Sequence, residues 1–186
     1  MNYILNLNIP IWAEETLSDQ KRAIEDYTKA IEINPKSDSA YYNRGNSKSS
    51  LNDYHGAIFD FTKAIEINQR KINAYVNRGI ARSNLKDYQK ALSDHSKAIE
   101  LDPNNDKGYI SRDSCKIRMK DYKGAIIDYK KAIEINPLYF EAYYNRGLMK
   151  LKANQNNEAC KDFRKAVDLG SKDTIEQIKQ NCSNTK

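Results

Sequence analysis

Three cysteines and two histidines are the side chains in this 186-residue sequence best suited to bind a soft metal ion, and they are also strong candidates for nucleophilic or acid–base chemistry. Cys115, Cys160 and Cys182 are odd in number and form no Cys-x-x-Cys pair, which is typical of reduced thiols rather than of a zinc or disulfide framework. His55 falls on an outward helical position. His95 stands where similar segments carry Phe or Tyr, so we interpret it as a core side chain. The sequence contains no His-Glu-x-x-His or Gly-x-Ser-x-Gly motif. We therefore predict a non-enzyme without cofactor or metal ion.

Arginine and aspartate recur at a fixed spacing and could form either ion pairs or an anion-binding ladder. The arginines are Arg44, Arg78, Arg112 and Arg146, and the matching acids are Asp60, Asp94, Asp128 and Asp162. Because every arginine of the set has its own carboxylate, we expect structural pairs between adjacent helices. Asp26 continues the series of acids, but Pro10 stands where its arginine would be.

An internal repeat positions these residues. The block Ala40-Tyr41-Tyr42-Asn43-Arg44-Gly45 returns every 34 residues, starting again at Ala74, Gly108 and Ala142. The block Ala57-Ile58-Phe59-Asp60-Phe61 recurs in the same way and is followed in each copy by Lys-Ala. With this period, the aromatic opening, the glycine at the eighth position and the closing Asn-Pro or Asp-Pro, the chain resembles the tetratricopeptide repeat family.

The resemblance implies an all-α fold, a right-handed α-solenoid of helix-turn-helix repeats with a C-terminal capping helix. The expected parts are an irregular N-terminal segment (1–16), a partial first repeat that keeps only its second helix (17–37), complete repeats at 38–71, 72–105, 106–139 and 140–173, and a capping helix with a tail (174–186). We expect that second helix over about Ser18 to Ile33. Asp53, Asp87 and Asp121 are expected to cap the second helices of their repeats.

The glycines at the eighth position are expected to let the two helices of a repeat approach closely against the alanine of the second helix. Gly45, Gly79 and Gly147 follow this pattern, but Asp113 replaces the glycine of the third repeat. A carboxylate there is costly unless it reaches solvent or a cation such as Lys116. Arg112 is the other cation within reach.

The charge and apolar content of the sequence indicate which kinds of partner the protein can have. The net charge is +6, but Lys alternates with Glu and Asp along the second helices, so we interpret the charge as a solvated face rather than a nucleic-acid surface. No apolar run has the length of a transmembrane helix.

We expect a cytoplasmic protein. The alternative is an exported or periplasmic protein, if residues 1–13 are a signal peptide, although no Lys or Arg precedes the apolar stretch. In that case Cys160 and Cys182 are the expected disulfide pair, because the capping helix must lie against the last repeat.

In tetratricopeptide arrays the first helices line a concave groove that receives a peptide or helix of another protein. The resemblance therefore implies a protein-interaction module that acts as a scaffold or assembly factor. The predicted groove residues are Tyr42, Asn43, Asn46, Val76, Asn77, Ile80, Lys107, Ile110, Ser111, Tyr144, Asn145 and Leu148. An asparagine amide can donate to and accept from a peptide backbone. The alternative is that these asparagines only stabilise the array.

Two further functions stay open. Some family members clamp the C-terminal carboxylates of chaperones, and Asn46, Asn77 and Lys107 match that clamp, whereas Tyr42 and Ser111 replace two of its three cations. A basic surface that binds nucleic acid or anionic surfaces is the other alternative.

Overall fold

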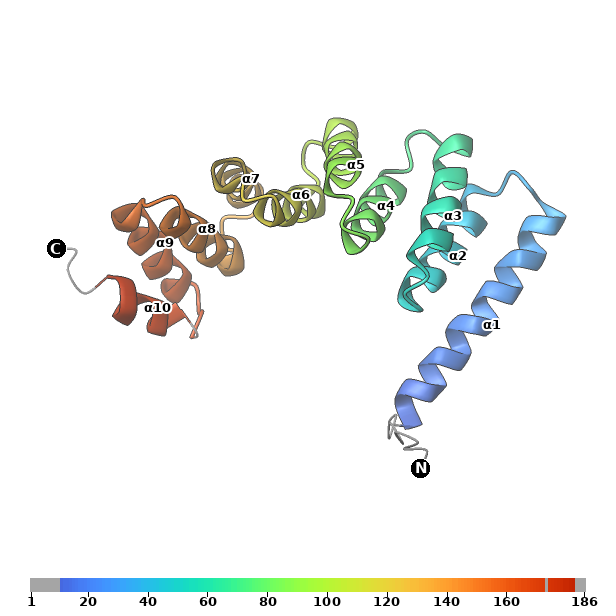
Figure 1. Cartoon of the computed structure of the whole chain (residues 1–186), viewed down its shortest axis with the longest axis horizontal. Coiled ribbons are helices and arrows are strands. Elements are labelled where there is room, and N and C mark those ends of the chain that lie inside the picture. The colour runs from blue at the N-terminus through green and yellow to red at the C-terminus, as the bar shows by residue number, and fades with distance from the viewer. Residues whose placement is uncertain (1–10, 173, 183–186) are drawn as a thin grey trace, which may run out of the picture. The chain divides into compact units, whose positions relative to one another are not determined.

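The computed structural model describes residues 11–172 and 174–182, which form helices joined by short turns (Figure 1). The helices are α1 (Ile11–Ile33), α2 (Asp38–Ser50), α3 (Tyr54–Ile67), α4 (Ile72–Asn84), α5 (Tyr88–Leu101), α6 (Asp106–Arg118), α7 (Tyr122–Ile135), α8 (Phe140–Lys152), α9 (Asn156–Asp168) and α10 (Thr174–Asn181). The described residues contain no strand. The predicted fold class, helix-turn-helix repeats followed by a capping helix, is confirmed.

The chain divides into two compact units, and each is described separately. The N-terminal unit ends at Ala81 and the C-terminal unit begins at Arg82, within α4. None of the described helices combines the length and apolar character needed to cross a membrane.

The turns inside the repeats follow from their local sequence. The residue that ends each turn segment has positive φ, between 59° and 64°, at Asn52, Lys86, Lys120 and Asn154. The next residue in three of these turns is an aspartate whose carboxylate accepts a hydrogen bond from the backbone N–H three residues later, at Asp53, Asp87 and Asp121. A residue in the left-handed region ends one helix and a capping aspartate starts the next, so the predicted caps are confirmed.

The start of α1 differs from the prediction. The helix begins at Ile11 rather than near Ser18, so residues 11–16 are helical and not irregular. In the sequence, Pro10 directly precedes the helix, and a proline at the start of a helix is common because the first helical N–H groups have no partner within the helix. The rest of the predicted N-terminal segment, residues 1–10, lies outside the described residues, as does most of the proposed signal peptide.

Close packing at the eighth position is confirmed where the described contacts show it. A Cβ atom added to Gly45 would lie 2.8 Å from the ring of Phe61, and one added to Gly147 would lie 2.6 Å from Phe163. The surface that the glycine meets is therefore the aromatic ring of the second helix, not the alanine that we expected. Phe61 and Phe163 are both 0% exposed. These two positions require glycine because any side chain would enter the space of the ring.

Asp113 has a different environment from the one expected. It is 1% exposed, so it does not reach solvent. Arg112 and Lys116, the two candidate cations, bind Asp128 instead, with N–O distances of 2.6 and 2.7 Å. The hydroxyl of Ser114 donates to Oδ1 of Asp113 at 3.2 Å, and Oδ2 has no hydrogen bond among the described residues.

The burial of Asp113 changes its protonation. Burial raises the pKa of the carboxyl to about 7, against a smaller lowering by the side chains of Tyr129 and Ser114. Tyr129 holds the position of Phe61 and Phe163, so this repeat differs from α2–α3 and α8–α9 at both members of the glycine–phenylalanine contact. The repeat therefore carries a polar pair in a place that is apolar in α2–α3 and α8–α9.

His95 is a core side chain, as predicted. It is 0% exposed, and neither ring nitrogen has a hydrogen bond among the described residues. Burial, with a contribution from Arg112, lowers its pKa to about 4. His95 is therefore neutral at physiological pH and fills the volume of an aromatic ring.

Candidate functional site

The repeated arginines are bound to buried carboxylates. Arg44 donates from Nε and a terminal nitrogen to both carboxylate oxygens of Asp60, at 2.9 and 2.7 Å, and Lys48 adds a contact of 2.8 Å. Arg112 with Asp128 and Arg146 with Asp162 repeat this two-point geometry.

The second complete repeat (72–105) is divided between the two units at Ala81 and Arg82, and related contacts occur in each of them. Arg78 donates to Thr62 at 3.1 Å, and Asp94 accepts from Arg82 at 2.7 Å. Asp60, Asp94, Asp128 and Asp162 are at most 5% exposed, so the predicted structural pairs are favoured over an anion-binding ladder.

In the N-terminal unit, polar side chains of α2 and α4 surround a hollow of about 360 Å³, lined by Asn46, Ser49, Ser50, Asn77 and Ile80. Asn46, Ser49 and Ser50 lie three to four residues apart on one face of α2, and Asn77 and Ile80 are spaced in the same way on α4. The repeat therefore places two short polar faces side by side.

Two asparagine amides in this hollow are hydrogen-bonded to each other. Nδ2 of Asn77 donates to Oδ1 of Asn46 at 2.7 Å and to the hydroxyl of Tyr42 at 3.2 Å. In the part of the chain that the structure describes, Nδ2 of Asn46 and Oδ1 of Asn77 form no hydrogen bond. The pair thus keeps one donor and one acceptor for a further polar group.

Lys71 supports the same region and was not among the predicted residues. Its Nζ lies 5.3 Å from the centre of the Tyr42 ring, 3.1 Å from Asp38 and 3.0 Å from the hydroxyl of Ser39. Lys71 is the last residue of its repeat, where the next two repeats have Asn105 and Tyr139, so the repeat pattern contains no signal for it.

The other predicted groove residues have varied environments. Val76 is 4% exposed and is part of the core, so its side chain does not line a groove as predicted. Leu148 packs against both apolar clusters of the C-terminal unit. Lys107 is exposed and makes no ion pair among the described residues. Three further predicted residues are partly exposed: Asn43, Ile110 and Ser111.

The C-terminal unit has a second hollow, of about 340 Å³, lined by Phe140, Glu141, Tyr144, Asn145 and Ser171. Tyr144 and Asn145 were predicted, and Tyr144 also packs on Phe163 with 6.1 Å between ring centres. Ser171 was missed because it lies at the end of the last repeat, in the turn between α9 and α10, whereas the predicted groove residues all lie on first helices.

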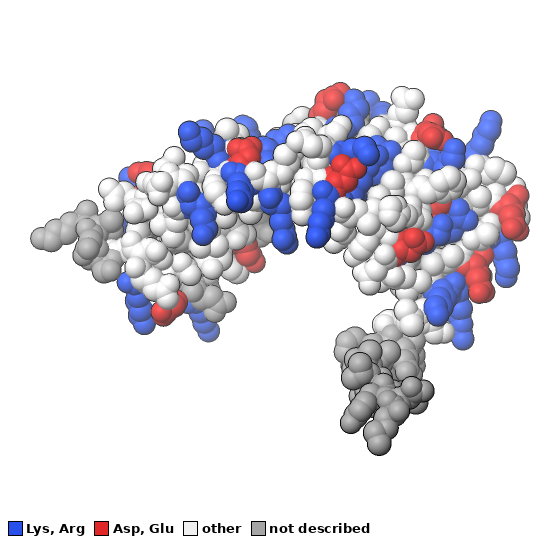
Figure 2. Space-filling view, in the orientation of Figure 1, with Lys and Arg blue, Asp and Glu red and all other residues white. Residues whose placement is uncertain are grey.

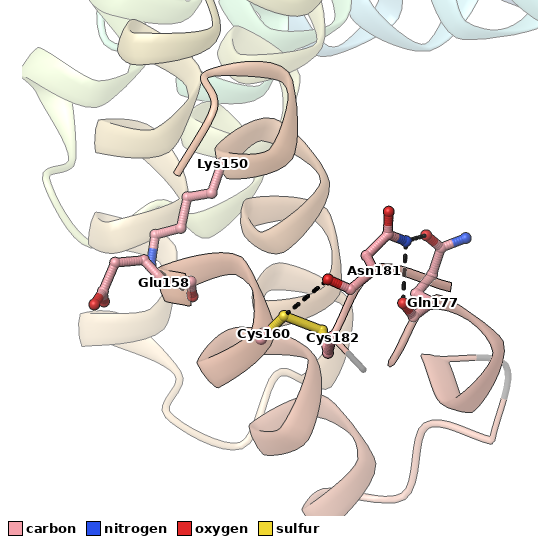
Figure 3. The surroundings of a disulfide bond; sticks show 6 residues. All are labelled: Lys150, Glu158, Cys160, Gln177, Asn181 and Cys182. Carbon is pink, nitrogen blue, oxygen red and sulfur yellow. Dashed lines mark hydrogen bonds between the residues drawn. A yellow bond between two sulfur atoms is a disulfide. The ribbon is translucent and has the colours of Figure 1, made fainter. Parts of the chain in front are cut away.

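A disulfide bond joins the capping helix to the last repeat. Cys160 in α9 and Cys182, directly after α10, have Cα atoms 5.7 Å apart (Figure 3). This is the pair expected for an exported protein, and it contradicts the interpretation of all three cysteines as reduced thiols, because the packing of α10 on α9 brings Cys182 next to Cys160. Cys115 is a buried free thiol. Within the described residues, no group of three or more His, Cys, Asp or Glu side chains is arranged to hold a metal ion.

Charges of both signs are mixed on the surface. On the face of each unit drawn in Figure 2, acidic side chains lie among the basic ones. Several lysines form ion pairs with a glutamate on the same helix, as in Lys63–Glu66, Lys97–Glu100 and Lys131–Glu134. That face therefore presents no continuous basic patch of the kind that nucleic-acid binding requires.

Family models match most of the sequence. The tetratricopeptide repeat model matches residues 39–71 and 72–105, a second model of the same description matches 140–172, and a TPR repeat model matches 17–49 and 118–152. None of the curated proteins matches this sequence.

Solved structures share the fold. A crystal structure of MamA is 24% identical, with a TM-score of 0.78 over 92% of this chain and 98% of that one. YrrB, described as a TPR protein with an unusual peptide-binding site, is 22% identical, with a TM-score of 0.75 over 89% of this chain and 86% of that one. The first TPR of Spaghetti, bound to the HSP90 peptide SRMEEVD, is 24% identical, with a TM-score of 0.61 over 63% and 93%. The chain belongs to the tetratricopeptide repeat family.

Proposed function

We propose that this protein is a non-enzymatic interaction module whose hollow between α2 and α4 binds an extended peptide segment of another protein. The observation that carries the proposal is the Asn46–Asn77 pair, which keeps an amide N–H and a carbonyl oxygen open to the hollow. A peptide group has the complementary acceptor and donor. Such contacts hold a backbone without reading its side chains, which suits a scaffold or assembly factor.

Two of the similar structures support this choice. The description of YrrB names a peptide-binding site, and Spaghetti is bound to a peptide. In the C-terminal unit we propose that Lys107, Ile110, Ser111, Tyr144 and Asn145 contribute further peptide contacts.

The carboxylate-clamp alternative is less favoured. The cation next to Tyr42 is Lys71, and Asp38 already neutralises it at 3.1 Å. A terminal carboxylate would have to compete with that acid, whereas an uncharged backbone would not.

Replacing Asn77 with Ala should weaken peptide binding about tenfold or more, because it removes the open acceptor and releases Asn46. The probe is a random-peptide phage library selected on the full chain, and the selected peptide is then measured by calorimetry against the variants. Asn104→Ala, an exposed asparagine outside both hollows, is the matched control and should bind as the parent does.

The melting temperature of Asn77→Ala should fall only slightly, because the lost hydrogen bonds are partly exposed and contribute about 0.5–1.5 kcal/mol. A large fall in melting temperature with unchanged peptide binding would mean that Asn77 only stabilises the repeats. Lys107→Ala should reduce the salt dependence of binding through the loss of one screened charge.

For the cellular location, the Cys160–Cys182 bond supports the exported alternative over the cytoplasmic one, because cytosolic reductants keep thiols reduced. Protein purified from its native source under denaturing, non-reducing conditions should therefore react with a thiol reagent at Cys115 alone. Three reactive thiols would contradict both the bond and the exported location.

A further inference from the structure

Helix α1 has the sequence of a second helix of a repeat, but among the described residues no first helix of its own repeat packs against it. The segment Ala23-Ile24-Glu25-Asp26-Tyr27 matches Ala57-Ile58-Phe59-Asp60-Phe61 of α3. In α3, α7 and α9 the equivalent aspartates are at most 5% exposed. In α1, Asp26 is exposed and has no ion pair among the described residues, and Ala23, Tyr27 and Ala30 are only partly buried.

The contact between α1 and α2 leaves this surface open. The hydroxyl of Thr28 on α1 accepts a hydrogen bond from Arg44 of α2 at 3.1 Å. The same contact joins Thr62 to Arg78, where α3 meets the next repeat. Helix α2 therefore occupies the flank that meets the following repeat, and no described helix covers the flank with Asp26 and Tyr27.

The complete repeats show what covers such a surface. In α2, an arginine, a glycine and a lysine at relative positions 1, 2 and 5 lie over the acid and the ring of α3, as Arg44, Gly45 and Lys48. In α8 the same pattern holds, with Arg146 and Lys150 at 2.6 and 2.8 Å from Asp162. The aspartate thus binds two cations of the same helix, and the aromatic ring packs against the glycine of that helix.

We propose that the Asp26 surface of α1, formed by Ala23, Asp26, Tyr27 and Ala30, binds an amphipathic helix of another polypeptide. That helix carries an arginine, then a glycine or alanine, and a lysine or arginine one turn after the first arginine. The arginine and the second cation bind Asp26, and the small residue packs on Tyr27. This site is separate from the hollow between α2 and α4 and goes beyond the proposed function.

Charge complementarity selects a foreign helix over residues 1–10 and over a second copy of this chain. Residues 1–10 contain no Lys or Arg, so they cannot supply the cations. A second copy of the chain offers the pattern in α2 and α8, but those cations are bound to Asp60 and Asp162 of their own repeats.

The test uses a fluorescent peptide with the sequence of residues 138–153, which contains the pattern of α8, and measures its binding to the full chain by anisotropy. Asp26→Arg should weaken binding at least about tenfold, as expected for loss of a two-cation contact. The same peptide with Glu at both cationic positions should bind Asp26→Arg better than it binds the parent. This restoration by exchanged charges requires direct contact between the two helices.

Glu25→Arg is the matched control, because its position is exposed even in covered helices, as at Phe59 (56%) and Ile127 (61%). It should leave binding nearly unchanged. Equal weakening by Glu25→Arg and Asp26→Arg would reduce the effect to general charge attraction and overturn the proposal. Three other outcomes would also overturn the proposal. They are no binding at about 1 mM peptide, binding that appears only after residues 1–10 are deleted, and self-association of the chain alone that Asp26→Arg abolishes.

Discussion

Replacing Asp113 with Gly, the residue of the other complete repeats, is expected to raise the free energy of unfolding by about 3 kcal/mol at pH 9 and to change it little at pH 4. The folded pKa of this carboxyl is about 7, above its ordinary value of 3.8. A carboxyl whose pKa is raised by folding does not lower the free energy of unfolding while it is protonated in both the folded and the unfolded state. Its cost grows as the pH rises above the ordinary pKa and is complete above the folded pKa. Urea unfolding of parent and variant between pH 4 and 9 measures the difference.

Asp113→Asn is the control that separates charge from shape. It keeps the size of the side chain but cannot ionise, so its free energy of unfolding relative to the parent should rise with pH as that of Asp113→Gly does, and the difference between the two variants should not depend on pH. If both variants differ from the parent by the same amount at pH 4 and pH 9, Asp113 does not titrate as described, and its effect is one of packing alone.

Replacing Arg146 with Ala is expected to lower the free energy of unfolding by about 3 kcal/mol, because Asp162 would stay buried after losing its two-point partner. Asp162 is 5% exposed, and Arg146 contacts both of its oxygens, at 2.6 and 2.8 Å. Lys150 still contacts Asp162 in this variant. The expected loss in the free energy of unfolding is therefore near the lower end of the range for broken buried ion pairs. Urea unfolding at pH 7 measures this loss.

Arg118→Ala, an exposed arginine of the same unit, is the matched control and should change the free energy of unfolding by less than about 0.5 kcal/mol. The double variant Arg146→Met, Asp162→Leu should lose less than Arg146→Ala alone, since no acid is left buried without its partner. A loss from Arg146→Ala no larger than that from Arg118→Ala would show that the buried pair adds nothing to stability.

The sequence by itself determined the features that depend on residues within one repeat. The turns and the capping aspartates at Asp53, Asp87 and Asp121 follow from a few neighbouring residues. The pairing of Arg44 with Asp60 follows from the fixed geometry of two helices joined by a short turn. The 34-residue period reports such contacts because each repeat must make them again.

Only the tertiary structure decided the features that depend on what lies against each residue. Helical position placed Val76 in the groove, but its side chain is buried. The two cations beside Asp113 in the sequence bind Asp128 instead. The bond from Asn77 to Asn46 joins two repeats, so the spacing within one repeat does not predict it. The sequence period specifies the direction in which a side chain leaves its own helix. Its burial and its hydrogen-bond or ion-pair partners depend on the shape and charge of the helix that packs against that side chain.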